Sequence, residues 1–142
     1  MTIARLLEGR SSPIITCDAS QTVRAAVAQL AEQRIGAMPV LRGGALAGIF
    51  SERDVIYRLH EEGERVLDRP VEAVMTAPAL TVDPGTEVLV ALSLMTQRRI
   101  RHLPVVQGGA MVGFISIGDL VKYRIDRVES EAQAMRSYIQ MA

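Results

Sequence analysis

The chain has 142 residues, of which 49% are apolar, and its sixteen basic and sixteen acidic residues cancel. This apolar content is enough for a packed core and excludes a disordered chain, while the balanced charge excludes a global attraction to nucleic acid or to an anionic membrane. No apolar run approaches the roughly 18 residues of a membrane span, and the N-terminus does not resemble a secretory signal. The single cysteine, Cys17, cannot form an internal disulfide, so we expect a cytoplasmic protein.

The first half of the chain predicts a strand, a helix, a hairpin and a second helix, after a short lead-in helix near residues 2–7. The strand covers residues 14–17. The next helix has apolar residues at i, i+3, i+4 and i+7, namely Val23, Ala26, Val27 and Leu30. The hairpin turns at "RGG", where glycines tolerate positive φ. Ser51 then begins a helix that Gly63 stops.

The second half repeats the first at a constant offset. Asp119 minus Asp54 is 65, and "GIFSERD" at Gly48 returns at this spacing as "GFISIGD" at Gly113. The repeat predicts a strand over residues 79–82 and a helix whose buried face is Val88, Ala91, Leu92 and Met95. Between the copies, Pro70 is a suitable first residue for a short helix over residues 71–75.

The last helix differs from its counterpart because no glycine stops it. Apolar residues recur at spacings of four and three from Val121 to Ile139, so we expect this helix to continue almost to the C-terminus. An apolar seam of that length needs a partner, and we expect a homodimer.

The duplicated unit resembles the CBS domain, a family found in tandem pairs. The resemblance rests on an apolar residue and Pro-Val before a glycine-containing hairpin, and on "GhhSxxD" (h, apolar) at the closing helix. It covers residues from about 14 to 124 and implies an α+β (α/β) fold of two pseudo-symmetric βαββα units packed through their sheets, plus a long C-terminal helix. We expect the first unit with its lead-in helix over residues 1–65, the second over residues 66–124, and a helical extension over residues 125–142.

The resemblance also implies a regulatory role, sensing an adenine nucleotide, S-adenosylmethionine or a dinucleotide in clefts between the units. In such pairs the aspartate of this motif accepts hydrogen bonds from the ribose hydroxyls, which suits the two acceptor oxygens of a carboxylate. One cleft, called here cleft one, is expected to contain Ile35, Gly36, Ala37, Ser116 and Asp119. The other, cleft two, is expected to contain Ser51, Arg53, Asp54, Thr76, Ile100, Arg101 and His102.

Cleft two is the more basic, because Arg98 and Arg99 precede Ile100 in "QRRIRH". We therefore expect phosphates to bind there through charge-assisted hydrogen bonds. AMP-like ligands fit best, with NAD(H) and S-adenosylmethionine as alternatives. The basic run is also compatible with a solvated helix end, and nucleic-acid binding is disfavoured because five aromatic residues offer no stacking platform.

A serine followed three residues later by an acid is also a capping box. In that alternative the chain is a constitutive assembly module that binds no ligand. No catalytic constellation and no metal-ligand spacing is present, so we expect no enzymatic activity. The sequence therefore predicts a non-catalytic nucleotide sensor that acts on a partner in trans.

Overall fold

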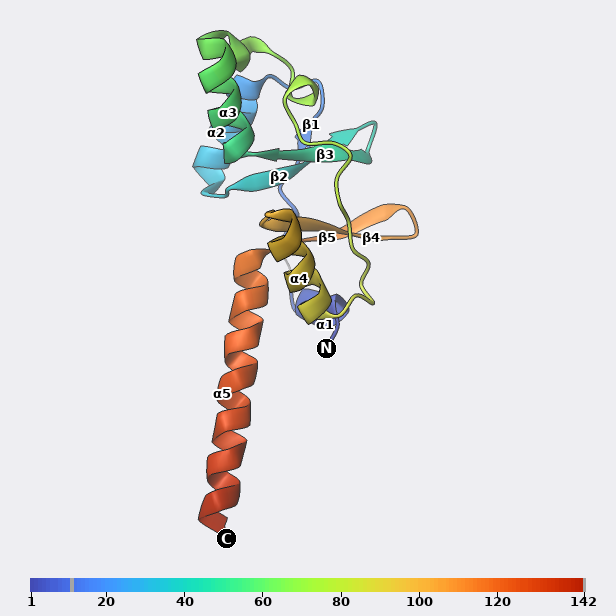
Figure 1. Ribbon diagram of the computed structural model, residues 1–142. Helices are drawn as coiled ribbons and strands as arrows, with labels where there is room; N and C mark the ends of the chain where they lie inside the picture. The colour runs from blue at the N-terminus through green and yellow to red at the C-terminus, as the bar shows by residue number, and fades with distance from the viewer. Residues whose placement is uncertain (11, 142) are drawn as a thin grey trace.

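The computed structural model describes residues 1–10 and 12–141, so Ala142 of the expected extension lies outside the described part. The first unit contains β1 (Cys17–Asp18), α2 (Val23–Gln33), β2 (Ala37–Arg42), β3 (Ala45–Ser51) and α3 (Glu52–Glu62). The second contains α4 (Val88–Arg98), β4 (His102–Gln107), β5 (Ala110–Ser116) and α5 (Ile117–Met141). Figure 1 shows the two sheets face to face, with helices on the outer side of each and α5 projecting below. The predicted fold is confirmed.

Both hairpins form as the sequence predicts. β2 pairs antiparallel with β3, and β4 pairs antiparallel with β5. Gly43 and Gly44 in the first turn have φ of 59° and 81°, and Gly108 and Gly109 repeat these angles in the second. Two consecutive residues with positive φ give the turn that matches strand twist, which explains the paired glycines.

The first strand of each copy is shorter than predicted. β1 pairs in parallel with β2 only through Cys17 and Asp18, because Pro39 stands opposite residue 16 in this register and has no N–H to donate. In the second copy the strand is reduced to a single bridge from Val82 to Val105. Ala19 donates its N–H to the Leu41 carbonyl at 2.8 Å, whereas the equivalent residue, Pro84, cannot make this bond.

The predicted helix faces form the two cores. Val23, Ala26 and Leu30 are buried in the first, with Val27 half-buried beside them. The second core buries the equivalent residues Val88, Ala91 and Met95, with Leu92 packed against it. Cys17 lies in the first core at 4% exposure, and burial, followed by the nearby Asp18 charge, raises the pKa of its thiol to about 11. It is a small buried core residue.

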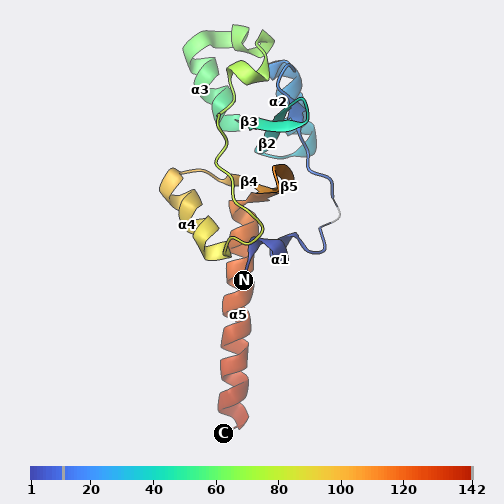
Figure 2. The same cartoon turned by 90° about the vertical axis from the view of Figure 1, so that its right-hand side faces the viewer.

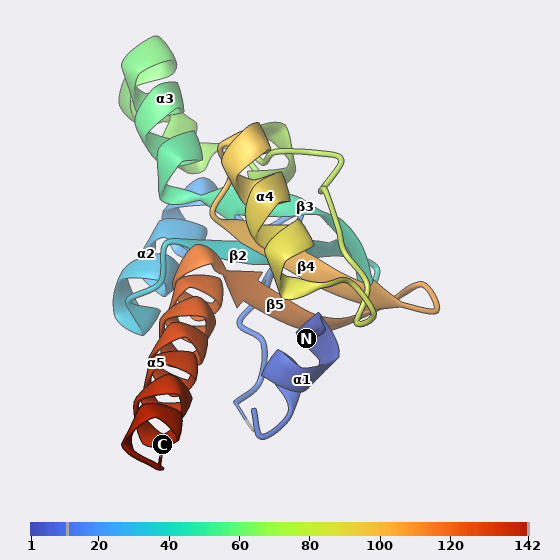
Figure 3. The same ribbon diagram turned by 60° about the horizontal axis from the view of Figure 1, so that its bottom comes forward.

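The lead-in segments pack on the opposite copy from the one that follows them in sequence. Ile3 of α1 (Ile3–Leu7) is fully buried in the second core, and its N–H donates to the Thr86 carbonyl at 2.9 Å. Figure 3 shows α1 and α4 covering the same face of the β4–β5 sheet. Val66 and Val71 instead complete the first core. The expected boundary between the units at residue 65 stays a prediction. Each lead-in segment lies on one side of this boundary in sequence and packs in the core on the other side.

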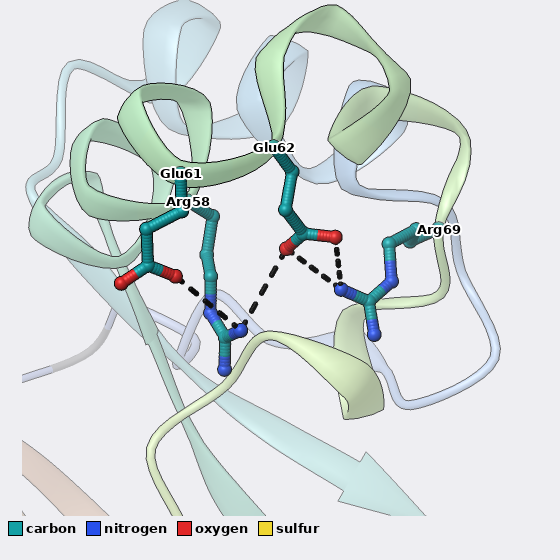
Figure 4. A network of polar contacts seen from close by, with 4 residues as sticks. All are labelled: Arg58, Glu61, Glu62 and Arg69. Atoms are coloured by element: carbon teal, nitrogen blue, oxygen red, sulfur yellow. Dashed lines mark hydrogen bonds and ion pairs between the residues drawn. The ribbon is translucent and has the colours of Figure 1, made fainter.

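The connector between the copies is mostly 3₁₀ helix. It contains η1 (Gly63–Asp68) and η2 (Val71–Ala73), so the helix expected over residues 71–75 is shorter and tighter, with Pro70 just before it. An ion-pair network holds the start of the connector. The Glu62 carboxylate accepts from Arg69 at 2.6 and 2.7 Å and lies 3.6 Å from Arg58 (Figure 4).

The long helix α5 begins on the second core and then leaves it. Leu120 is fully buried and Tyr123 is half-buried, whereas every described residue after Tyr123 is exposed. Figure 2 shows the rest of α5 extending clear of both units. The helix therefore runs almost to the C-terminus, as predicted. Among the described residues, no helix is both long enough and apolar enough to cross a membrane.

Candidate functional site

Both serine–aspartate pairs cap a helix. At the start of α3, the Asp54 Oδ2 accepts from the Ser51 N–H at 2.9 Å and from the Ser51 hydroxyl at 3.0 Å. The Ser51 Oγ accepts from the Asp54 N–H at 3.4 Å. At the start of α5, Asp119 accepts from the Ser116 N–H at 2.8 Å, and its own N–H donates to the Ser116 hydroxyl at 3.2 Å. The capping box expected from the sequence is present in both copies.

Asp54 has a further partner because Gly48 lets the connector approach β3. The Ile49 and Thr76 backbones exchange two hydrogen bonds of 2.9 Å. A Cβ at Gly48 would lie 2.7 Å from the Thr76 carbonyl oxygen and 2.8 Å from the Met75 sulfur. Glycine is therefore required for this close approach. The approach places the Thr76 hydroxyl 3.1 Å from Asp54 Oδ1, to which it donates.

Asp54 lines a cleft of about 650 Å³ between the two units, a size usual for small-molecule sites. The cleft contains all the residues predicted for cleft two: Ser51, Arg53, Asp54, Thr76, Ile100, Arg101 and His102. Arg98 and Arg99, at the end of α4, line it as well. The Arg53 side chain reaches toward the second unit and donates to the Arg99 carbonyl at 3.3 Å. The carboxylates of Asp54 and Glu52 and a set of arginines thus line the same cleft.

The capping aspartate of the second copy, Asp119, has a different side-chain partner. Arg10 lies 2.9 Å from Asp119 and also donates to the Phe114 carbonyl at 3.3 Å. Burial alone raises the pKa of the Asp119 carboxyl, but the Ser116 N–H and the Arg10 guanidinium outweigh it and hold that pKa below its ordinary value. The carboxylate is therefore ionised and already paired with a cation of its own chain.

Arg10 reaches Asp119 because the first lead-in segment is longer than the second. Isolated bridges join Thr2 to Glu87 and Thr22 to Pro70. The first lead-in segment therefore runs from Thr2 to Thr22, a span of 20 positions, and the second runs from Pro70 to Glu87, a span of 17 positions. The first segment is three residues longer. These residues include the region of Arg10. Leu7 lies over Gly113 as Met75 lies over Gly48, with 2.8 Å between a Cβ at Gly113 and a Leu7 methyl group.

Two of the residues predicted for cleft one, Gly36 and Ala37, line cleft two. Gly36 and Ala37 line the cleft of about 650 Å³ together with Ser51, and Ile35 packs against the first core. The reason is strand register: Ala37 pairs with Ser51, and the Gly36 carbonyl accepts from the Glu52 N–H at 3.0 Å. The start of β2 therefore lies beside the end of β3 in the same copy. The prediction for cleft one did not take this neighbouring strand into account.

His102 lies where the two copies meet. Its ring stacks on Phe114 with 5.3 Å between centroids, and it lines the cleft of about 650 Å³. Burial is the main reason that its pKa is lowered. The carboxylates of Asp119 and Glu52 act in the opposite direction, and Arg101 adds to the lowering. The pKa of His102 is thus influenced by acidic side chains from both copies.

Sequence reasoning missed several residues of the cleft: Ile49, Glu52, Tyr57, Pro78, Ala79 and Leu80. Tyr57 follows Asp54 by three positions, and residues at this spacing share a helix face, so the pattern could have revealed it. The apolar residues 78–80 follow Thr76 in a segment without periodicity. Within residues 1–10 and 12–141, no group of three or more His, Cys, Asp or Glu is placed to hold a metal ion.

The sequence profile of the CBS domain matches this chain twice, over residues 10–61 and 71–126. The chain belongs to the CBS domain family. The two matches correspond to the two units of the structure, so the molecule is a tandem CBS pair. Its cleft of about 650 Å³ lies between the two CBS units.

Relatives of this CBS pair have been named from several organisms. The CBS domain-containing protein CBSX3, mitochondrial, of Arabidopsis thaliana is 38% identical over 129 residues, which cover 87% of this chain and 63% of that protein. YhcV of Bacillus subtilis is 32% identical over 78% of both chains. A putative signal-transduction protein with CBS domains from Burkholderia ambifaria has a solved structure with a TM-score of 0.82. It is 38% identical, and the match covers 89% of this chain and 95% of that one.

Two solved CBS pairs with lower identity carry ligands. CBSX2 was solved in complex with AMP and matches with a TM-score of 0.74 at 24% identity, over 88% of this chain and 96% of that one. The CBS pair of MJ0100 was solved with 5-methylthioadenosine and S-adenosyl-L-methionine, and it matches with a TM-score of 0.77 at 21% identity, over 89% and 98%. At this identity the likeness is one of fold.

Proposed function

We propose that this chain is a regulatory module that binds an adenine nucleotide in cleft two and transmits its occupancy to a partner protein in trans. The observation that carries the proposal is the set of groups in that cleft. The carboxylate of Asp54 shares about 650 Å³ with the arginines 53, 98, 99 and 101 and with apolar side chains. A nucleotide offers the matching groups: a cis-diol, phosphates and a flat base.

Asp54 is suited to the ribose. Its Oδ2 is held by Ser51, while its Oδ1 has the Thr76 hydroxyl as a partner. A carboxylate oxygen accepts about two hydrogen bonds, so Oδ1 has capacity for a ribose hydroxyl. The Thr76 hydroxyl can also rotate toward the ligand. The cap fixes the carboxylate in place before the ligand arrives, so little entropy is lost on binding.

The arginines are suited to phosphate. Arg98 and Arg99 end α4, and Arg101 follows after one residue, so three guanidinium groups come from one short segment. Guanidinium groups bind phosphate oxygens in a bidentate manner, and the N-terminus of α3 adds a favourable dipole. S-adenosylmethionine carries a positive charge and meets repulsion here. We therefore infer that AMP-class nucleotides bind best, with NAD(H) as the next alternative.

Cleft one is a weaker candidate because Arg10 already neutralises Asp119. A ribose there must compete with a guanidinium attached to the same chain. We therefore expect one nucleotide per chain at moderate concentration. The AMP complex of CBSX2 and the S-adenosylmethionine complex of MJ0100 support the adenosyl class of ligand, and the basic cleft supports the phosphate.

The test is isothermal titration of the purified chain with AMP, ADP, ATP, NAD and S-adenosylmethionine, repeated with Asp54→Asn and its matched control Asp119→Asn. Both substitutions remove one capping carboxylate. Loss of a charged hydrogen-bond partner costs about 1.5–3 kcal/mol, so Asp54→Asn should weaken binding roughly 10- to 150-fold. Asp119→Asn should change the affinity little. Equal losses in both variants would contradict the assignment to cleft two.

The second candidate function is a constitutive assembly module, favoured by the capping boxes at Ser51 and Ser116. In that case none of the five ligands binds the wild-type chain. Both substitutions then lower only the free energy of unfolding, by about 1 kcal/mol. Thermal melts without ligand measure this loss separately from binding.

We further propose that the module is a non-catalytic homodimer in the cytoplasm and that its partner is a separate chain. Exposed apolar side chains support the dimer, among them Ile56 on α3 and Leu89 and Val90 on α4. A ligand in cleft two would hold the second unit's arginines near Asp54. Occupancy can reach the partner only if two arrangements of the units differ in affinity for the nucleotide.

A further inference from the structure

The outer part of α5 carries an apolar seam that is separate from the face used for its own core. Leu120 and Tyr123 contact the second core. At about 100° per residue, the centre of the seam lies roughly 100° around the helix from Leu120 and roughly 160° from Tyr123. It contains Val121, Ile125, Val128, Ala132, Met135 and Ile139, all exposed. Figures 1 and 2 show that, among the described residues, no other helix or strand lies beside the outer part of α5.

The seam has the spacing of a coiled coil. Alternating steps of four and three place Ile125, Ala132 and Ile139 at the a positions of a heptad, and Val121, Val128 and Met135 at the d positions. Ile125 and Ile139 are β-branched residues at a, as in two-stranded coiled coils, while the d positions carry Val and Met where that pattern has Leu. The exposed fractions are 52% for Ile125, 62% for Met135 and 64% for Ile139, so a large apolar surface is left to bury. Helices of this kind gain most of their stability from packing such a face.

The charges beside the seam select the orientation of the partner. In a parallel, in-register pair, each g position faces the e position five residues later in the other helix. Arg124 at g then meets the partner's Glu129, and Glu131 at g meets the partner's Arg136. Both contacts join opposite charges, and each occurs twice by symmetry. Glu131 already binds Arg127 in its own helix at 3.1 Å, which leaves room for a second donor.

An antiparallel pair with the same overlap is unfavourable. It places Val121 opposite the partner's Ile139. Glu129 then lies near Glu129 of the partner subunit, and Glu131 lies near Glu131 of the partner subunit. Lys122 then meets the partner's Arg136. These contacts join like charges, which are destabilising. The same sequence therefore favours one orientation and disfavours the other.

We propose that α5 pairs with α5 of a second copy of this chain as a parallel, in-register, two-stranded coiled coil. The two second CBS units then lie at the same end of the assembly, and the dimer is head-to-head. This inference does not depend on nucleotide binding, because none of the seam residues lines cleft two.

The orientation is tested by Met135→Cys in the full chain under mild oxidation. A parallel pair places residue 135 beside its symmetry mate at a d position, so a disulfide-linked dimer should form in high yield. In the antiparallel pair residue 135 faces residue 125, and no such dimer forms. Ser137→Cys, at an outer f position of the same helix, is the matched control. The wild-type chain controls for Cys17, which is 4% exposed.

A charge exchange provides the second measurement. Arg124→Glu should weaken the dimer about tenfold in sedimentation equilibrium, because two attractive contacts become repulsive. Adding Glu129→Arg in the same chain should restore it, although residues 124 and 129 are not neighbours on one helix. Ser137→Glu, which adds an acidic residue at an outer f position, should leave the dimer unchanged. A monomeric wild-type chain, a dimer without the 135 cross-link, or a failure of the rescue would each overturn the proposal.

Discussion

The guanidinium of Arg10 lies 2.9 Å from the carboxylate of Asp119, whereas the equivalent carboxylate, Asp54, is approached by the Thr76 hydroxyl at 3.1 Å. The two copies thus present the same capping aspartate with different partners. A hydroxyl can yield to a ribose at little cost, but a guanidinium is a competing cation. We therefore expect the two clefts to differ in their affinity for a nucleotide.

Arg10→Gln should therefore give Asp119 back its acceptor capacity. We expect AMP to bind with two sites per chain instead of one, measured as stoichiometry in isothermal titration. The pKa of the Asp119 carboxyl should rise toward its ordinary value, because one of the groups that lower it is gone. Arg24→Gln, which removes the exposed ion pair with Asp68, is the control. A stoichiometry that stays at one would show that Arg10 does not limit the site.

Gly48→Ala and Gly113→Ala form a matched pair in equivalent strands. The new methyl group at residue 48 meets the Thr76 backbone carbonyl at 2.7 Å, which cannot move without breaking the bridge to Ile49. At residue 113 it meets only the end of the Leu7 side chain, which can rotate. Overpacking typically costs about 1–3 kcal/mol. We expect a loss of that size in urea unfolding for Gly48→Ala and a clearly smaller one for Gly113→Ala.

Gly48→Ala should also weaken AMP binding, because displacing Thr76 disturbs its contact with Asp54. Gly113→Ala should leave the affinity unchanged. Equal stabilities of the two variants would mean that the connector adjusts as freely as the Leu7 side chain does.

His102 predicts a pH dependence of stability. Its pKa is lowered in the folded chain, chiefly by burial, so the unfolded chain takes up a proton at higher pH than the folded one. Stability from this residue is complete above the unfolded pKa of about 6.5 and is lost as pH falls toward the lower folded pKa. Urea unfolding between about pH 8 and pH 5 should show this loss. His102→Gln should flatten the profile, and His60→Gln, an exposed residue, should not.

Much of the fold could be predicted from the sequence because each unit is written twice. The helix faces around Val23 and Val88 and the turns at Gly43 and Gly108 follow from local spacing and backbone freedom, and all are observed. The shortened first strands were not predicted, because they depend on which carbonyl stands opposite Pro39 or Pro84. That information lies in the register between distant strands.

In the candidate site, too, local features could be predicted from the sequence and long-range contacts could not. Residues of cleft two that are near one another in sequence, such as Ser51 with Asp54 and Ile100 with His102, were predicted together and line one cleft. Arg10 was not predicted because it lies outside the repeat and reaches Asp119 only through tertiary packing. Gly36 and Ala37 were assigned to cleft one because the neighbour set by the β2–β3 register was not considered.

The crossed packing of the lead-in segments affects how the molecule is made. During synthesis, α1 is made before the second unit, yet the core that buries Ile3 also contains Leu120. The packing of α1 therefore cannot be completed until the second unit has left the ribosome. In the same way, the first core lacks Val66 and Val71 until the connector is complete. We therefore expect the two halves to unfold in one cooperative transition, because each core contains a segment from the other half of the chain.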